Sequence, residues 1–384
     1  MTKEVKLDFG MQRNIDMQIA LTKKLAEAMG IRPSPVREVI NPLFTWTANW
    51  TKVWDNRRTE DMLVLVNNAT RFTVAIYQVK RKDMKDVGAE MMTAAIRDTL
   101  LALNLNIEII DEYLRLSGDV EFVVNSDRQF TAWVNKAGTE CAYHVGHNYN
   151  GVAKMFSDTI GVFVNHHPVG YTNSHDGGFI PYKKMFDALA ELTGKPVYKY
   201  RAFELLVTLD LEIYQAMRRL IVPADIELPQ LHKILQQVFH WKDYHLHDWN
   251  VFDEKNRESV ARLVMTDEDL SYDDKAILEA GHKLSEFLPK YKHIIYTYDM
   301  GDNWKHLIEL VRMIDDHNEE SPYLLEAVGQ APPEDVGGVS GYIHFRKIMQ
   351  NPQHEDYEQM KQWAGFWHLE LSEWESRPQV IYRW

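Results

Sequence analysis

The chain has 384 residues, of which 45% are hydrophobic and 26% are charged, a composition typical of a soluble globular protein. This length exceeds one ordinary hydrophobic core and therefore predicts two domains. The single cysteine, Cys141, excludes an intrachain disulfide bond and a zinc site built from several cysteines. No run of 18 apolar residues occurs and the first residues contain no apolar leader, so we expect a cytoplasmic protein without a membrane span.

The net charge of −13 is concentrated in the second half of the chain. Up to Val197, 23 acidic residues balance 23 basic residues, whereas 33 acidic and 20 basic residues follow. An acidic surface repels phosphate backbones. Nucleic-acid binding through the C-terminal half is therefore not expected.

The first half combines short strands with helices. Thr22 and Gly30 have the residue types of helix caps, and they predict a helix over 23–29. The spacing of apolar residues predicts two helices within 89–116 and a closing helix over 182–192. β-Branched and aromatic residues predict strands over 17–20, 43–54, 62–66, 72–79, 120–124 and 131–134.

A basic cluster follows the fourth of these strands and consists of Lys80, Arg81, Lys82 and Lys85. We interpret it as the solvated start of a helix, because such charge runs usually face water. A DNA-binding patch is the alternative, and it would show itself as retention on DNA that weakens steeply with salt.

Two histidine-containing segments, 165–168 and 175–178, also invite a functional interpretation. Their spacing matches no metal motif, and Asn, Gly and Pro are typical of loops, so we predict loops at both places. Cys141 lies close to Tyr143 and His144, an arrangement compatible with a thiol nucleophile. A lone cysteine is more often a buried apolar residue, which is our interpretation.

A helix stop followed by a proline at 194–196 predicts domains of 1–195 and 196–384. An alternating run over 245–252 predicts a strand with His245, His247 and Trp249 on one face. The other predicted elements of this domain are strands over 203–209 and 217–222, helices over 228–239, 342–349 and 354–364, and a long acidic surface loop over 254–274. Because strands and helices are grouped, the predicted class is α+β, with a small, mainly antiparallel sheet packed with helices in each domain.

A β-hairpin is predicted around the turn 300–303. Apolar and aromatic residues alternate on both sides of this turn, at Ile294, Tyr296 and Tyr298 before it and at Trp304, His306, Ile308 and Leu310 after it. Gly301 is expected to supply positive φ in the turn. Trp304 and His306 share one face of the second strand, and Asp299 and Asp302 flank the turn.

The second half resembles the plasmid pRiA4b ORF-3-like family. The resemblance extends from about residue 198 to about residue 365 and depends on several blocks in a fixed order. These are Arg218–Pro223, Leu231-His232, Val238–Trp241, His245–His247, Tyr296–His306, Pro332–Gly338 and Gly341-Tyr342. It implies an α+β fold and a protein found on plasmids or carried by transposable elements, in a family without an established biochemical activity.

Two positions depart from the family pattern. Members often have Phe where Met300 stands and Cys where Ala331 stands, so a thiol-based role at that place is lost. The first half resembles a second, uncharacterised bacterial domain family. That resemblance depends on Thr22–Glu27, Trp46–Asn49, Arg57-Arg58 and Val66–Phe72.

If the blocks of the second half converge, their polar and aromatic side chains form a candidate binding site. Its members are His245, His247, Asp299, Asp302, Trp304, His306, Glu334 and Asp335. Imidazole and carboxylate groups suit zinc, manganese or iron, and with or without a metal they can move protons. The sequence identifies neither a bound metal nor a catalytic residue.

A purely structural interpretation of the same residues is also open. Asp299 and Asp302 would then bind backbone amides of the turn, His306 would pair with a carboxylate, and Trp304 would pack beside Trp241. Glu334 and Asp335 would cap the helix that contains Tyr342, or pair with Arg218 and Arg219.

No phosphate-binding loop, dinucleotide fingerprint or serine-hydrolase elbow occurs in the sequence. We therefore expect a binding or adaptor protein associated with mobile elements, with a protein or a small ligand as its partner. The alternative is a metal-dependent hydrolase or nuclease that uses the His/Asp/Glu residues.

Overall fold

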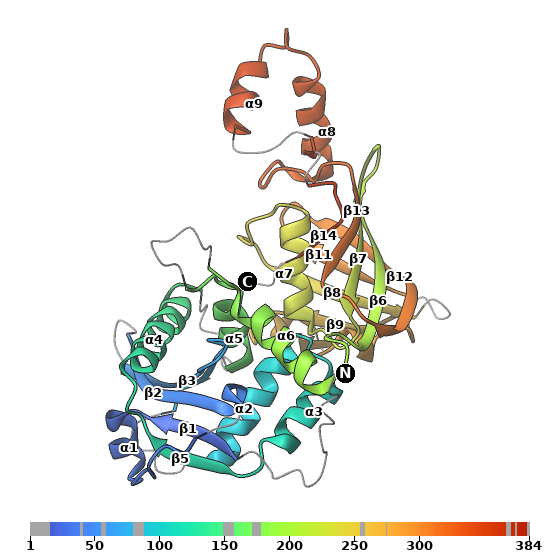
Figure 1. Ribbon diagram of the computed structural model, residues 1–384. Coiled ribbons are helices and arrows are strands. Elements are labelled where there is room, and N and C mark those ends of the chain that lie inside the picture. Colours follow the sequence, from blue (N-terminus) through green and yellow to red (C-terminus); the bar gives the residue numbers. More distant parts are fainter. Residues whose placement is uncertain are drawn as a thin grey trace, which may run out of the picture. The chain divides into compact units, whose positions relative to one another are not determined.

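The computed structural model describes residues 16–38, 41–54, 59–79, 88–148, 157–170, 178–253, 258–273, 275–365, 370–372 and 375–381. The chain separates into two compact units, Met1–Lys199 and Tyr200–Trp384, which we call the N-terminal and C-terminal units (Figure 1). Each unit has its own sheet and helices, so the predicted α+β class is confirmed. The basic cluster of Lys80 to Lys85 lies outside the described residues, as does the segment 171–177, which contains His175.

The N-terminal unit is built on a five-stranded mixed sheet with the order β4-β3-β2-β1-β5. Its strands are β1 (Met17–Leu21), β2 (Thr45–Trp54), β3 (Thr59–Asn67), β4 (Thr73–Tyr77) and β5 (Val120–Val124). Strand β1 is parallel to both of its neighbours, β2 and β5, whereas β2, β3 and β4 are antiparallel. Five of the six predicted strands in this half are therefore present.

Helices pack on both faces of this sheet. They are α1 (Lys23–Met29), α2 (Ala89–Ala102), α3 (Ile107–Leu116), α4 (Arg128–Asn148), α5 (Ser157–His166) and α6 (Pro181–Thr193). On one face Ile19 and Trp46 pack with α2, α3 and α6, and on the other Val64 and Val66 pack with α4 and α5. The predicted caps of α1 are present, since the Leu25 amide donates to Thr22 Oγ1 and Gly30 has a φ of 70°.

The predicted strand over 131–134 is wrong, because these residues lie in α4. Asp127 Oδ1 accepts from the Gln129 amide at 2.6 Å and so caps a helix at this point. From there Val134, Ala137, Cys141 and Val145 recur at helical spacing and pack in one core cluster. Burial raises the pKa of the Cys141 thiol, which favours the apolar interpretation of this residue over a nucleophile.

The predicted loop over 165–168 is also partly wrong, because Asn165 and His166 end helix α5. The Asn165 carboxamide is fully buried and replaces a strand partner for Thr73, accepting its amide at 2.8 Å and donating to its carbonyl at 2.7 Å. A buried amide that satisfies backbone groups in this way has a structural role.

The C-terminal unit contains a nine-stranded sheet with the order β10-β9-β8-β11-β12-β6-β7-β13-β14. Its strands are β6 (Tyr200–Leu211), β7 (Tyr214–Pro223), β8 (His247–Asp253), β9 (Glu258–Val264), β10 (Ala276–Leu278), β11 (His293–Tyr298), β12 (Trp304–His317), β13 (Tyr323–Val328) and β14 (Gln379–Val380). All pairs are antiparallel except β9 with β10.

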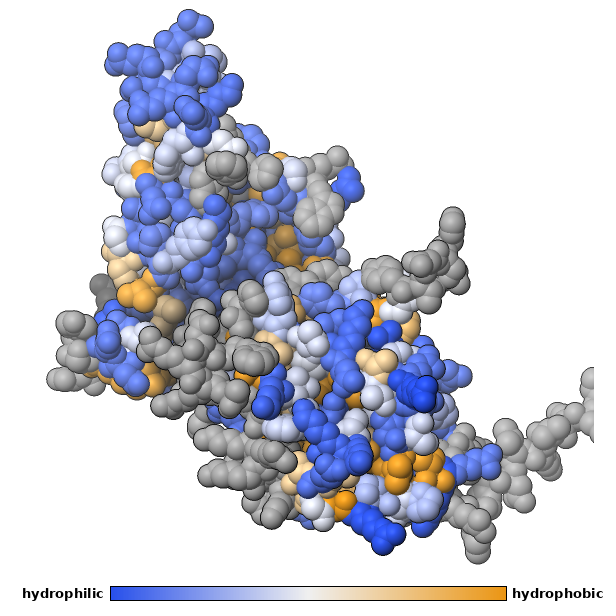
Figure 2. Space-filling view, turned by 90° about the vertical axis from the view of Figure 1, so that its left-hand side faces the viewer, coloured by the Kyte–Doolittle hydropathy of each residue, from blue (hydrophilic) through white to orange (hydrophobic). Residues whose placement is uncertain are grey.

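Helix α7 (Leu228–Val238) packs its apolar side against this sheet and completes the core with the inward residues of β6, β8, β11 and β12. Helices α8 (Gly338–Met349) and α9 (Tyr357–Trp363) follow β13, as the sequence predicts. At the top of Figure 2 the end of the unit that carries them is covered by hydrophilic side chains, and α9 buries none of its residues.

The acidic segment 254–274 is not only the predicted surface loop, because it contains β9 and a short 3-10 helix at Asp269–Tyr272. Leu263 of β9 is fully buried, and the guanidinium of Arg262 pairs with Asp248 on the neighbouring strand at 2.7 Å. The many acidic residues of this segment predicted a loop where the chain in fact forms a strand.

The predicted hairpin is present, with Tyr298 opposite Trp304 and Tyr296 opposite His306. Its turn differs from the prediction, because Gly301 does not have positive φ. Asp299 and Asn303 have it instead, at 56° and 58°. Asp299 Oδ1 accepts from the amides of Gly301 and Asp302 at 2.8 and 3.2 Å, so an Asx turn fixes the backbone here.

Candidate functional site

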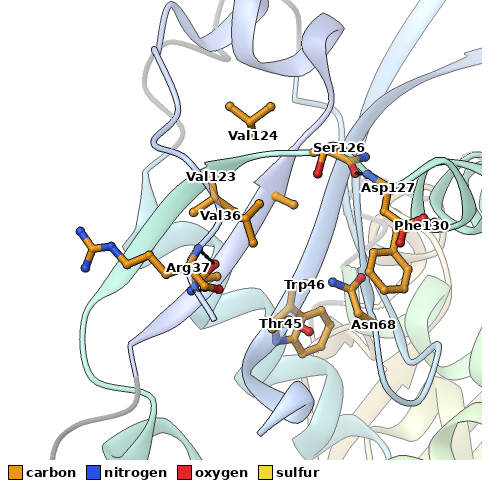
Figure 3. Close-up of a pocket in the computed structure, with 13 residues that line it drawn as sticks. Val36, Arg37, Thr45, Trp46, Asn68, Val123, Val124, Ser126, Asp127 and Phe130 are labelled. Carbon is orange, nitrogen blue, oxygen red and sulfur yellow. Dashed lines mark hydrogen bonds between the residues drawn. The ribbon is translucent and has the colours of Figure 1, made fainter. Parts of the chain in front are cut away.

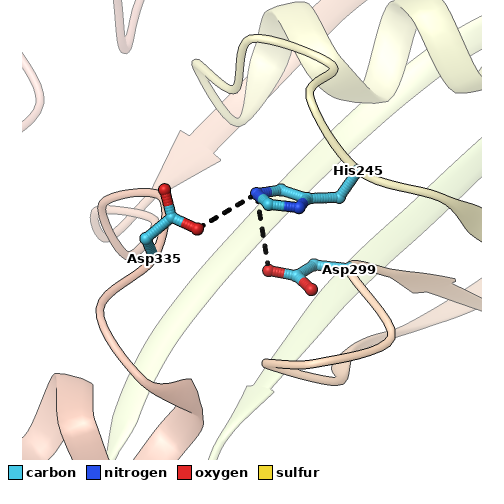
Figure 4. Close-up of side chains that lie close together, drawn as sticks. All are labelled: His245, Asp299 and Asp335. Carbon is cyan, nitrogen blue, oxygen red and sulfur yellow. Dashed lines mark ion pairs between the residues drawn. The ribbon is translucent and has the colours of Figure 1, made fainter.

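One histidine of the C-terminal unit faces three carboxylates, and we call this group the His245 cluster. His245 Nε2 lies 3.7 Å from Asp299, 3.7 Å from Glu334 and 3.3 Å from Asp335. His245 belongs to the turn before β8, Asp299 follows β11, and the other two lie in the loop between β13 and α8. Figure 4 shows the carboxylates of Asp335 and Asp299 directed at the imidazole from two sides.

The imidazole of His245 is not satisfied by these neighbours. Its Nε2 atom is buried and has no hydrogen-bond partner in the part of the chain that the structure describes. The side chains of Asp299 and Glu334 are 9% and 3% exposed, whereas that of Asp335 is 70% exposed. The cluster is therefore closed on one side and open to solvent on the other.

Glu334 is held in place by hydrogen bonds from outside the cluster. Its Oε1 accepts from the Lys242 amide at 2.8 Å and from the Tyr298 hydroxyl at 3.1 Å, and the same hydroxyl accepts from the Tyr244 amide. Burial raises the pKa of Glu334, and the Lys242 amide partly opposes this shift. A nearby cation would favour the charged form of this carboxylate.

The two carboxylate oxygens of Asp299 face different groups. Oδ1 accepts the amides of the turn, and Oδ2 is the atom nearest to His245. Asp302 lies outside the cluster, where its Oδ2 accepts from the Gly337 amide at 3.1 Å and ties the hairpin to the β13–α8 loop.

Besides Asp302, three further predicted site residues lie outside the cluster. His247 Nε2 donates to Glu279 Oε2 at 2.9 Å, and its ring stacks on His232 with ring centroids 3.7 Å apart. Trp304 and His306 are fully buried in the core, with their rings 6.4 and 5.1 Å from that of Trp241. His245 and His247 do not share a face, because β8 begins only at His247 and the alternation does not extend to the turn.

The structural alternatives for these residues hold in part. Asp299 binds the turn amides and Trp304 packs beside Trp241, as that interpretation requires. His306 Nδ1 instead lies 3.2 Å from the Tyr296 carbonyl oxygen. No side chain caps α8, the buried Arg218 donates to backbone carbonyls, and Arg219 pairs with Glu204.

A second polar group lies inside the unit, and sequence reasoning missed it. We call it the buried network, and it contains His232, Asp243, His247, Glu279, Trp249 and Tyr296. His232 bridges the Tyr296 hydroxyl at 2.7 Å and Asp243 at 2.8 Å, and the Trp249 indole donates to Glu279 at 2.6 Å. The sequence signals for it were the position of His232 beside Leu231 in a predicted helix and the alternation that places His247 and Trp249 on one face of a predicted strand.

The His245 cluster has the donor set and the dimensions of a metal site. His245, Asp299 and Asp335 each offer one ligand atom, and these atoms lie within 4.8 Å of one another. An ion bound at about 2.1 Å places neighbouring ligand atoms about 3 to 4 Å apart, as the distances from His245 do. One imidazole with carboxylates suits zinc, manganese or iron, and Glu334 is a candidate fourth ligand.

Comparisons with known proteins relate both halves of the chain to existing families. The family described as plasmid pRiA4b ORF-3-like protein matches residues 201–375, and a domain of unknown function (DUF6933) matches residues 18–184. Uncharacterized protein y4hQ of Sinorhizobium fredii is 35% identical over 161 residues, which are 41% of this chain and 78% of that protein.

A solved structure is also similar, that of the protein of unknown function MM3350 from Methanosarcina mazei Go1. It is 28% identical, covers 46% of this chain and 97% of its own, and superposes with a TM-score of 0.39. Among the described residues, none of the helices combines the length and the apolar character needed to cross a membrane.

Proposed function

Because this chain belongs to the plasmid pRiA4b ORF-3-like family, we propose that it is a cytoplasmic, non-enzymatic binding or adaptor protein associated with mobile genetic elements. In this proposal the C-terminal unit binds a divalent transition-metal ion at the His245 cluster. The observation that supports metal binding is the buried Nε2 of His245, which has no hydrogen-bond partner among the described residues and faces three carboxylates at 3.3 to 3.7 Å. The partner of the protein is another protein or a small ligand, since the acidic second half disfavours phosphate backbones.

Electrostatics supports a cation at this position. Asp299, Glu334 and Asp335 converge on one imidazole, and like charges at such distances destabilise one another unless a proton or a cation intervenes. A bound ion would connect the turn before β8, the β11–β12 hairpin and the β13–α8 loop. The ion would then act mainly to hold three segments of a binding surface together.

The test is the metal content of the full chain, purified without an affinity tag, together with calorimetric titration of Zn²⁺ and Mn²⁺. We expect one ion per chain, and we expect His245→Ala to abolish binding. His282→Ala is the matched control, because His282 pairs with a single carboxylate, Glu286, at 2.8 Å. Failure of both metals to bind, or equal binding by His245→Ala, would overturn the proposal.

A metal-dependent hydrolase or nuclease is the second candidate function, and the exposure of Asp335 favours it. The open side of the cluster leaves room for a water molecule, which a bound ion would activate as a nucleophile. Hydrolysis of model phosphodiesters that requires added Mn²⁺ and disappears in His245→Ala would support this function. Metal binding without any such hydrolysis would support the adaptor.

A further inference from the structure

A groove crosses one face of the sheet in the N-terminal unit and encloses about 270 Å³ (Figure 3). On this face α4 covers β2 and β3, while Gln18 and Ala20 of β1 line the floor of the groove. The groove lies wholly in described residues and is separate from the His245 cluster, which belongs to the other unit.

A polar residue in the floor of the groove, Gln18 of β1, holds one of its walls. Gln18 alternates with the buried Met17 and Ile19, so its carboxamide points to the opposite face of the sheet. There it donates to the Arg37 carbonyl at 3.1 Å and accepts from the Arg37 amide at 3.3 Å. These two bonds fix the chain around Val36 beside the sheet without filling the groove.

The walls present apolar surface to the solvent. Val36 and Val124 are 55% and 46% exposed, and both line the groove. Phe130, in the first turn of α4, lines the groove opposite Val36 and Val124 (Figure 3), and its ring contacts that of Trp133 at a centroid distance of 5.4 Å. A supported aromatic ring beside exposed valines offers a site for a flat apolar surface.

Two hydrogen-bond donors in the lining of the groove have no partner among the described residues. Asn68 Oδ1 accepts from the Thr47 hydroxyl at 2.8 Å, whereas Asn68 Nδ2 has no partner in the described part of the chain. The Ser126 hydroxyl is also unpartnered there and exposed. Arg37 and Glu121 form an ion pair at the rim, and the Asp127 carboxylate lies near the start of α4, so the lining carries both signs of charge.

We propose that this groove binds a small, uncharged heteroaromatic molecule rich in hydrogen-bond acceptors, with free purine and pyrimidine bases as the fitting class. The volume lies near the lower limit of ligand pockets, about 300 Å³, which fits a single ring system better than a nucleotide. Phe130 stacks on the ring, while Asn68 Nδ2 and Ser126 donate to its acceptor atoms. The Asp127 carboxylate disfavours a phosphate group.

The experiment is a calorimetric titration of the full chain with adenine and uracil, and with indole as an aromatic ring that lacks acceptors. We expect saturable binding of at least one base and weaker binding of indole. Phe130→Leu removes the stacking ring and Asn68→Asp replaces the donor by an acceptor, so each should weaken binding about tenfold. Tyr143→Leu, on the exposed side of the same helix, is the matched control and should leave binding unchanged.

Ser126→Ala is a further variant that should fold normally, because the residue is exposed, and it should weaken binding severalfold. Circular dichroism and the unfolding midpoint verify the fold of each variant. A bound base should slow the amide hydrogen exchange of residues 123–130 in the wild-type chain. This measurement tests the location of the binding site without any substitution. The proposal is overturned if no base binds saturably, if indole binds as tightly, or if the groove variants bind like wild type.

Discussion

The C-terminal unit contains two groups in which histidines meet carboxylates, and they differ in how far their polar atoms are satisfied. In the buried network both ring nitrogens of His232 have partners, and Glu279 accepts from two side chains. His247 Nδ1 is the exception, a buried nitrogen without a hydrogen bond among the described residues, and no carboxylate group converges on it as three do on His245 Nε2. In the His245 cluster three carboxylates approach one nitrogen, yet that nitrogen has no hydrogen bond among the described residues. The same residue types therefore stabilise the fold in one place and leave unused binding capacity in the other.

The difference follows from the segments that carry the side chains. The four ring-bearing members of the buried network lie on α7, β8 and β11, whose backbone is fixed by the helix and the sheet. Its two carboxylates, Asp243 and Glu279, lie in the segments that precede β8 and follow β10. The His245 cluster is built from a turn and two loops, in which the donors are the backbone amides of Lys242, Gly301 and Asp302. Residues on loops that are positioned by a rigid scaffold are the more common ligand-binding residues.

The largest effect is expected from Glu279→Ala in the buried network. Loss of this carboxylate leaves the Trp249 indole and the His247 imidazole buried without their partner, which should lower the free energy of unfolding by about 4 kcal/mol. Urea denaturation measures the change. Glu370→Ala, which removes the carboxylate of a largely exposed pair with Arg346, should cost less than about 0.5 kcal/mol, and similar losses for both variants would contradict the distinction.

The next effect concerns pH, because burial lowers the pKa of His232 to about 4 and that of His306 to about 3. In the unfolded chain both have a pKa near 6.5, so between pH 6.5 and 4 only the unfolded state gains their protons. The free energy of unfolding must then fall as the pH falls through this window, by roughly 2 to 3 kcal/mol for each histidine.

Denaturation at several pH values between 4 and 7 measures this slope. His306→Asn should make the slope shallower, whatever its effect on stability at neutral pH, because one buried imidazole with a lowered pKa is then absent. His282→Asn is the control and should keep the wild-type slope. A slope that is unchanged in His306→Asn would show that this histidine does not cause the loss of stability.

Most elements of the fold could be predicted from the sequence, since helix caps and alternation are local signals. Thr22 and Gly30 delimit α1, and the alternation around Tyr296 and His306 gives the hairpin and its register. The predictions failed where a distant partner decides the conformation. Thr131 to Val134 have strand-forming residue types, but their position after Asp127 and against the sheet places them in a helix.

The candidate site was predictable only as a set of neighbouring blocks. The structure brings His245, Asp299, Glu334 and Asp335 together from three segments. Sequence alone could not separate them from His247 or His306. Whether a histidine points into the core or toward the loops depends on the residue at which its strand begins and on which residues pack over that strand. The unsatisfied nitrogen of His245 has no sequence signature at all.

A smaller effect is expected when the charge of one cluster member is removed. Asp335→Asn should weaken binding of the metal at least about tenfold, because a neutral amide is a poorer ligand for a divalent ion. Asp302→Asn is the same change on a neighbouring carboxylate that binds only the Gly337 amide, and it should alter affinity less than about threefold. Calorimetric titration with Zn²⁺ measures both. Equal losses would assign the effect to the general negative field of this surface.

The smallest effect is expected for Gly301→Ala, which tests whether a change in the hairpin turn also disturbs the His245 cluster. Gly301 does not need positive φ, and an added Cβ would lie 3.2 Å from Asp299 Oδ1, so a shift of a few tenths of an ångström suffices. The cost should stay below about 1 kcal/mol. Asn303→Val places a β-branched residue at a φ of 58° and should cost more, about 1 to 2 kcal/mol. If Gly301→Ala is instead the more damaging change in urea denaturation, glycine rather than the Asp299 carboxylate determines the turn, and the orientation of Asp299 toward His245 would depend on it.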